Sequence, residues 1–303
     1  MSLLSVIIPT RRRPAILQRA LERLANQTIA KELEIVVVHD GMDDADTRSM
    51  IETSCPLPCT YFAIPKAQQG TARNRGVQRA SADRILFIGD DIFLEHNACE
   101  MHVRGYETRA MSCEEHPLKT QDSKLKAHRA KLVALLGFTT WDPAVGITSV
   151  MRWLEATGWQ FGYGNIRRYA HCTLPKSIQH QFTYTSHLSL PTSVARHTPF
   201  REDITLYGWE DIEWGMRLRE VGIPLVYEPD AKALHHHHVE LQDSLERMHT
   251  VGRSLHTVAK FSPAFDRVPK GWKRIAYELL AYVPTLRGKH AAALLQGLKE
   301  QVV

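Results

Sequence analysis

The 303-residue sequence lacks the features that mark secreted, membrane-spanning or zinc-finger proteins. Its five cysteines are an odd number, and the one close pair, Cys55 and Cys59, has no second pair to complete a zinc site. No run reaches the about 18 apolar residues of a spanning helix, and the N-terminal apolar run is too short for a signal peptide. We therefore expect reduced thiols and a cytoplasmic protein.

Internal repeats and low-complexity tracts are also missing, and the 44% apolar and 23% charged residues are ordinary for a globular chain. The length allows either two domains or one large domain with additions. Lys and Arg number 38 against 33 Asp and Glu, so the formal charge is +5 and favours anionic partners. Nucleotide phosphates, nucleic acid and an anionic membrane all fit this charge.

Short β-branched runs alternate with amphipathic segments in the first third of the chain. The pattern predicts strands at residues 3–8, 34–38, 60–64 and 84–88, and helices at 14–26, 44–53 and 69–80. Strands that alternate with helices at this spacing predict a parallel, doubly wound sheet.

The remainder of the chain is less regular. Residues 96–140 look mainly helical and include a basic stretch at 119–131, and residues 158–190 contain short β-like runs. A helix is expected at 210–221 and strands at 223–227 and 231–238. Beyond residue 239 the pattern is helical, apart from a break at 263–270.

Polar side chains follow three of the predicted strands, in Pro9-Thr10-Arg11, in Asp40-Gly41 and in Asp90-Asp91. Each group alone would be an ordinary turn, but ligands of doubly wound sheets bind at this carboxyl edge. Adjacent carboxylates repel each other unless a cation offsets them, and Mg²⁺ is commonly held by carboxylates and substrate phosphates. The sequence therefore predicts a site for a metal and a diphosphate.

Six segments resemble the motifs of family 2 glycosyltransferases, in the family's order, over roughly residues 3–260. They are residues 5–10, 35–41, 69–76, 85–91, 208–213 and 227–235. Residues 69–76 match the family's G-x-x-x-A-R-N-x-G segment with one spacer fewer, and residues 208–213 are similar to its G-W/G-E-D motif. Two departures stand out, because His39 and Gly89 occupy positions where many members have aspartate.

The resemblance implies an α/β chain of the GT-A type, with a doubly wound mixed sheet flanked by helices and a C-terminal helical extension. The catalytic domain would span residues 1–240, with a nucleotide-binding half at 1–95 and an acceptor half at 96–240. Residues 241–303 would form the extension. The implied activity moves a sugar from a nucleotide-diphosphate donor, with a UDP-sugar favoured, to a hydroxyl of a glycan or lipid-linked saccharide, with inversion.

The resemblance also assigns roles by position. Asp211 would be the general base, Asp91 and His235 would bind Mg²⁺ or Mn²⁺, and Trp209 and Glu210 would contact the sugar or acceptor. The nucleotide-binding residues would be Pro9, Thr10, Arg11, Asp40, Arg73 and Asp90.

Several assignments have a plainer alternative. Asp211 and Glu210 begin a predicted helix, where carboxylates often serve only as caps. His235 and His237 would share one face of a strand, so either is a candidate metal ligand. Trp153, Trp159 and Tyr163 would form either a sugar platform or ordinary core.

Three other functions fit parts of the sequence. A sugar-phosphate nucleotidyltransferase would carry a glycine-rich loop after the first strand, and this chain has none there. A non-catalytic basic binding module is a second alternative. Nucleic acid is not an expected partner, because no reader motif accompanies the charge.

Residues 270–282 interleave apolar and basic side chains, which suits either an interfacial helix on the inner face of a membrane or a helix packed on its own domain.

Overall fold

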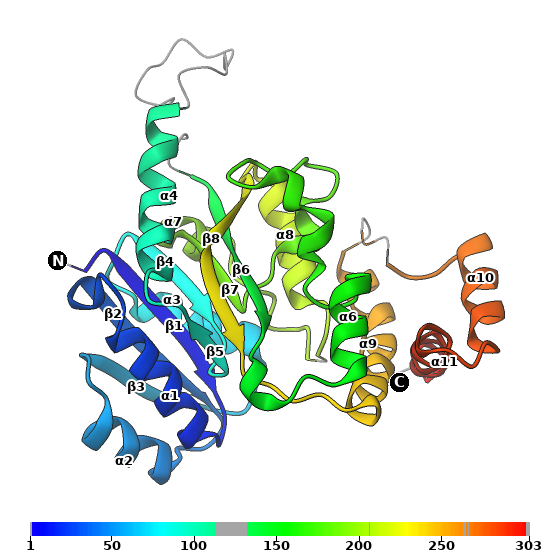
Figure 1. Ribbon diagram of the computed structural model, residues 1–303, viewed down its shortest axis with the longest axis horizontal. Helices are drawn as coiled ribbons and strands as arrows, with labels where there is room; N and C mark the ends of the chain where they lie inside the picture. The colour runs from blue at the N-terminus through cyan, green and yellow to red at the C-terminus, as the bar shows by residue number, and fades with distance from the viewer. Residues whose placement is uncertain (1, 113–131, 206, 263–264, 266, 301–303) are drawn as a thin grey trace.

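The computed structural model describes residues 2–112, 132–205, 207–262, 265 and 267–300. The described residues form one eight-stranded sheet with helices on both faces, and three helices follow it (Figure 1). The strand order is β3-β2-β1-β4-β7-β6-β8-β5. The basic stretch at 119–131 lies outside the described residues.

The first half of the sheet confirms the predicted βα alternation. Strands β1 (Leu4–Thr10), β2 (Leu33–Asp40), β3 (Cys59–Ile64) and β4 (Arg84–Ile88) are parallel, and helices α1 (Pro14–Ala25), α2 (Ala45–Ser54) and α3 (Gln69–Arg79) connect them. Alternate residues of each strand enter two separate cores, with Ile7 and Val36 on one face and Val6 and Ile35 on the other. Burial on both faces explains why β1, β2 and β4 are mostly apolar, whereas the edge strand β3 is only partly buried.

The second half contains antiparallel pairs, which confirms the mixed sheet that the resemblance implied. It contains β5 (Ile92–Leu94), β6 (Ala134–Trp141), β7 (His187–Pro191) and β8 (Leu225–His235). Strand β7 runs antiparallel to β4 and β6, and β8 runs parallel to β6 and antiparallel to β5. The helices of this half are α4 (Ala98–Ser112), α6 (Ser149–Thr157), α7 (Thr192–His197) and α8 (Glu210–Glu220).

Two sequence predictions are wrong in this half. Residues 134–141 form strand β6, not a helix, because this apolar run is buried in the sheet against β7 and β8. The strands expected at 223–227 and 231–238 are one strand, β8, whose pairing with β6 shifts between Gly137 and Phe138. The shift leaves Pro229 outside the ladder, where its missing N–H costs nothing.

Short 3-10 turns join several of these elements. They are η1 (Ala30–Glu32), η3 (Pro143–Val145), η4 (Gly162–Asn165), η5 (Arg167–Tyr169) and η6 (Gln179–Phe182).

Helix α3 lies unusually close to β1. A Cβ atom on Gly76 would overlap Cγ2 of Ile7, so this motif glycine lets the helix rest directly on the strand. The same helix carries Arg73, whose side chain is 3% exposed. Close packing at Gly76 therefore sets the height of Arg73 above the sheet.

The C-terminal helices are α9 (Leu241–Phe261), α10 (Trp272–Ala281) and α11 (Leu286–Lys299). Helices α9 and α11 cross closely, because Gly252 and Gly297 have no Cβ atom. A Cβ atom on either would overlap the backbone of the other helix. Ile204 and Met216 from the sheet region join the apolar core of these helices. Among the described residues, no helix has both the length and the hydropathy to cross a bilayer. The division at residue 240 stays a prediction.

Candidate functional site

A cavity of about 1250 Å³ lies at the carboxyl ends of β1, β2 and β4 and extends past the start of α8 to α9 and α10. Every residue to which the resemblance assigned a role lines it. They are Pro9, Thr10, Arg11, Asp40, Arg73, Asp90, Asp91, Trp209, Glu210, Asp211 and His235. The structure therefore brings the predicted residues together, whereas their individual roles stay predictions.

Asp90 is held from two sides at the end of β4. The Thr10 hydroxyl donates to its Oδ2 at 2.7 Å, and the guanidinium of Arg13 donates to both of its carboxylate oxygens. Arg13 precedes Pro14, the first residue of α1, so it projects from the helix start. Asp90 is only 1% exposed, and burial and the charge of Asp91 raise its pKa to about 6, although Arg13 and Thr10 oppose this shift.

Asp91 faces two histidines from the end of β8. Its Oδ2 lies 3.6 Å from Nε2 of His235 and 3.5 Å from Nδ1 of His237. Burial favours the neutral acid, but His235, His237 and Arg13 outweigh it and hold the pKa of Asp91 well below its usual range. One ligand atom from each of Asp91, His235 and His237 lies within 4.8 Å of the others. A carboxylate with two imidazoles fits a divalent transition metal ion.

The register of β8 explains why two of the four histidines reach Asp91. Ile92 pairs with His235, and the N–H of His236 donates to the carbonyl of Asp91 at 2.8 Å. Side chains alternate along the strand, so His235 and His237 share a face and stack at 5.4 Å. The His236 side chain points to Asp142 instead, with its Nδ1 atom 2.7 Å from Oδ2 of that aspartate. Nδ1 of His238 lies 2.8 Å from the carbonyl oxygen of Val145.

The end of the cavity at the carboxyl ends of the strands is here called the donor end, and the end at α9 and α10 the acceptor end, after the roles predicted for them. The donor end also contains Asp40 and Arg73. Asp40 accepts the N–H of Ala67 at 2.7 Å, which orders the segment before α3. Arg73 donates to Gln69 at 3.0 Å, but its Nε and Nη1 atoms have no partner among the described residues. Burial lowers the pKa of Arg73, with the charges of Glu210 and Asp211 opposing. A buried guanidinium with spare donors lining a cavity is suited to an anion.

The two departures from the family pattern have local explanations. His39 is buried and its Nε2 atom lies 3.3 Å from the backbone N of Arg12, so it braces the loop after β1. A Cβ atom on Gly89 would come within 2.8 Å of Oδ1 of Asp91. Glycine there leaves room for the Asp91 carboxylate to reach the histidines.

Asp211 is the second residue of α8. The backbone N–H of Ile212 donates to Oδ1 of Asp211 at 2.8 Å. The Thr183 hydroxyl donates to the backbone carbonyl of Asp211 at 2.7 Å. Burial raises the pKa of Asp211 to about 7, the charge of Glu210 adds to this, and Arg73 opposes it. Glu210 accepts the N–H of Gly208 at 3.0 Å. Glu210 thus caps the turn, whereas Asp211 has the pKa that suits a general base.

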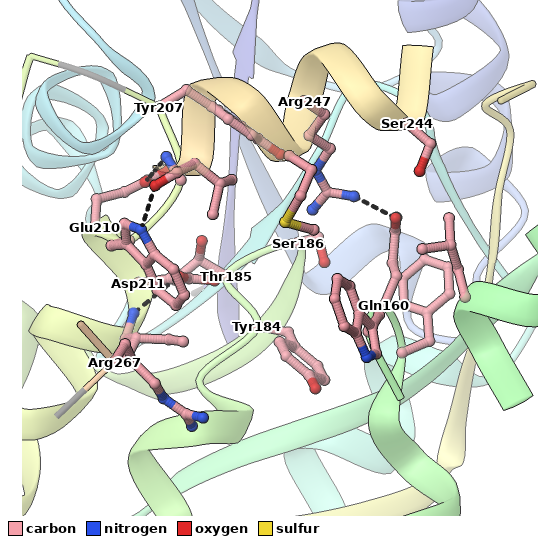
Figure 2. A pocket seen from close by; sticks show the side chains of 18 of the residues that line it. Gln160, Tyr184, Thr185, Ser186, Tyr207, Glu210, Asp211, Ser244, Arg247 and Arg267 are labelled. Carbon is pink, nitrogen blue, oxygen red and sulfur yellow. Dashed lines mark hydrogen bonds between the residues drawn. The ribbon is translucent and has the colours of Figure 1, made fainter. Parts of the chain in front are cut away.

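The acceptor end is built from α8, α9 and the segment before β7 (Figure 2). Arg247 on α9 donates to Gln160, and its guanidinium lies 5.7 Å from the Tyr207 ring centre. Figure 2 shows Tyr184, Thr185 and Ser186 facing the space below Arg247. Hydroxyls and amides that surround a cation are suited to a polar, oxygen-rich substrate.

The aromatic side chains divide between the two expected roles. Trp209 donates to the carbonyl of Val251 at 2.9 Å and packs edge-on against Phe265, so it ties α8 to the C-terminal helices while lining the cavity. Tyr163 is 4% exposed and belongs to the main core. The rings of Trp153 and Trp159 lie 5.4 Å apart at a tilt of 49°, and only Trp159 of these two lines the cavity.

Sequence reasoning missed Arg13 and left His237 as an alternative. Arg13 stood in a run of three arginines, and the proline that follows was the signal that it would project from the start of a helix. His237 needed only the strand to continue in extended form beyond His235. Both histidines, and not one alone, lie beside Asp91.

Comparisons with known proteins support the same interpretation. Residues 5–154 match the glycosyl transferase family 2 model. Validoxylamine A glucosyltransferase from Streptomyces hygroscopicus subsp. limoneus is 30% identical over 244 residues, which is 74% of this chain and 49% of that protein. The chain spans about half the length of the curated relatives it matches most fully, 49% and 53%.

Two solved structures share the fold. TarS of S. aureus, residues 1–349 with UDP-GlcNAc, has a TM-score of 0.55 and 17% identity, over 93% of this chain and 72% of that one. The mannosyltransferase PcManGT of Pyrobaculum calidifontis, with GDP-Man and Mn²⁺, has a TM-score of 0.56 and 12% identity, over 99% and 87%. The sheet order, the ordered motifs and these matches show that the chain belongs to glycosyltransferase family 2 and has the GT-A fold.

Proposed function

We propose that this chain transfers a sugar from a nucleotide-diphosphate donor to a hydroxyl of a glycan or lipid-linked saccharide, with inversion. The observation that carries the proposal is one cavity that contains both the Asp91–His235–His237 group and Asp211. The UDP-GlcNAc and GDP-Man complexes of two proteins with this fold support a nucleotide-sugar donor. We favour a UDP-sugar.

The donor end would hold the nucleoside diphosphate by charge and by hydrogen bonds. Arg11, Arg13 and Arg73 all line this end, and the buried Arg73 has spare donors. Asp91, His235 and His237 would hold Mn²⁺ or Mg²⁺, and such an ion stabilises the charge that develops on a diphosphate leaving group. Mn²⁺ suits this donor set better, because two of the three ligands are imidazoles.

Asp211 would act as the general base. It would accept the proton of the acceptor hydroxyl as that oxygen bonds to the anomeric carbon, while the bond from that carbon to the diphosphate oxygen breaks. Its pKa of about 7 keeps enough carboxylate at neutral pH while leaving the group basic. A single displacement of this kind inverts the anomeric carbon.

Calorimetric titration with UDP in the presence of Mn²⁺ tests the donor site directly. We expect UDP to bind the wild type and to lose most of its affinity in Asp91→Ala. The exposed Asp46→Ala, at the start of α2, is the matched control and should bind as the wild type does. Failure of UDP, GDP and dTDP to bind would overturn the donor site.

A screen of nucleotide sugars for metal-dependent hydrolysis then tests turnover and identifies the donor. Hydrolysis of one donor would separate an enzyme from a non-catalytic module on the same fold. Asp211→Asn should lower the rate of transfer to an acceptor by about 10²–10⁴ while UDP still binds, and Glu220→Gln at the exposed end of the same helix should keep the wild-type rate. Transfer by Asp211→Asn at the wild-type rate would remove Asp211 as the base.

A further inference from the structure

Helix α10 presents an apolar face that no described residue covers. Trp272, Ile275, Leu279 and Tyr282 are 75%, 58%, 67% and 88% exposed, and none of the helix residues Trp272–Ala281 is buried. Their spacing of three and four residues places them on one side of the helix. Large apolar side chains that gather in this way mark an interaction surface.

Basic residues are frequent in the segment that carries this face. Residues 270–289 contain five Lys or Arg and one acidic residue, Glu278, which bonds to Arg274. The basic residues are Lys270, Lys273, Arg274, Arg287 and Lys289. These five residues, here called the basic border, flank the apolar residues in sequence, and an apolar helix face in a basic segment fits an anionic lipid surface. Two copies of the same positive face would repel each other.

The helix also borders the cavity that contains Asp211. Trp272, Lys273, Ala276 and Tyr277 line that cavity as well, as do Arg267 and Arg287. In Figure 1, α10 lies at the end of the molecule opposite β3 and α2. A surface that touched α10 would therefore meet the acceptor end of the cavity and not the donor end.

We infer that α10 is an interfacial helix that binds an anionic membrane surface and directs the acceptor end of the cavity toward it. Trp272, Ile275, Leu279 and Tyr282 enter the headgroup region, and the basic border contacts lipid phosphates. The corollary that the acceptor is lipid-linked rests on the proposed function. Membrane binding itself does not, because it requires neither donor nor metal.

Sedimentation with vesicles tests the inference. The full chain should sediment with vesicles of phosphatidylcholine and phosphatidylglycerol, and only weakly with phosphatidylcholine alone. High salt should weaken the binding, because the border residues are screened. Absence of binding to the anionic vesicles would overturn the inference, whatever the outcome of UDP calorimetry.

The variant Ile275→Glu/Leu279→Glu should lower vesicle affinity by roughly tenfold or more, because both side chains would enter the lipid. Both are exposed and neither lines the cavity, so the variant should fold and bind UDP as the wild type does. Val221→Glu, at a 60% exposed apolar residue beside α8, is the matched control and should leave vesicle affinity unchanged. Unaltered vesicle binding by the double variant, or a vesicle-free dimer that it dissociates, would overturn the inference.

Discussion

Nη1 of Arg13 lies 3.0 Å from Oδ2 of Asp91, the same oxygen that faces His235 and His237. The Arg13 guanidinium therefore bonds to the carboxylate oxygen that a metal ion would use. Its charge also stabilises two adjacent aspartates that would otherwise repel each other.

Arg13→Ala should raise the affinity for Mn²⁺ alone by several-fold, because a competing positive charge is removed. The same change should weaken UDP binding in saturating Mn²⁺, because a phosphate contact is lost. Calorimetry with Mn²⁺ alone and then with UDP measures both effects. Arg23→Ala, an exposed arginine on the same helix, should change neither; weaker Mn²⁺ binding by Arg13→Ala would contradict the competition.

His235→Ala and His237→Ala should each weaken Mn²⁺ binding by about tenfold or more, because each removes one of three ligands. Titration of Mn²⁺ followed by electron paramagnetic resonance measures the free ion directly. His238→Ala is the matched control from the same tract, since that ring contacts Val145 and Glu240 instead. If only one of the first two variants loses affinity, the site uses a single histidine.

The pH dependence of turnover should report Asp211. Burial raises its pKa to about 7, so the base is protonated and inactive below that pH and ionised above it. We expect kcat to rise about tenfold per pH unit on the acid side and to level off above about pH 7. Asp211→Asn should lower kcat by about 10²–10⁴ and remove this limb of the profile.

Stability gives an independent measure of the same group. Because the folded pKa of Asp211 is raised, the folded protein holds a proton that the unfolded chain releases, and stability declines as pH rises through about 7. Asp211→Asn should therefore have a higher Tm than the wild type above that pH. An equal or lower Tm there would indicate that the carboxylate is well stabilised when charged.

Gly76→Ala should destabilise the fold by about 1–3 kcal/mol despite the better helix propensity of alanine, because its Cβ atom would overlap Ile7. UDP affinity should fall as well, since α3 carries Arg73. Urea denaturation and calorimetry measure the two effects. Arg75→Ala, at the half-buried neighbouring residue, should lose only the surface pair with Glu202 and change stability by less than about 1 kcal/mol.

The sequence predicted most of the first half of the fold, because β1 to β4 and their helices are set by local apolar patterns, and β1, β2 and β4 are buried on both faces. Strand β6 was mistaken for helix, since its ends depend on pairing with β7 and β8, which lie far along the chain. The sequence predicted two strands where the structure has the single strand β8, because the shift in pairing around Pro229 cannot be recognised without the partner strand β6.

The candidate site was predicted more completely than the fold around it. Residues at strand ends such as Asp40, Asp90 and Asp91 follow from the sheet rule, and Asp211 followed from the resemblance. Arg13 was missed because it lies at the start of α1 and contacts aspartates at the end of β4. These residues are far apart in the sequence, and a local pattern does not predict such a contact.

The alternation along β8 has a consequence for metal selectivity. Two imidazoles beside one carboxylate form a nitrogen-rich set, and such sites bind zinc more tightly than manganese. Zinc that lodged there would leave fewer open positions for a diphosphate, because it prefers four ligands in a tetrahedral arrangement. The proposed metal site would therefore bind zinc in competition with manganese, and the ratio of the two free metal ions would set which ion it holds.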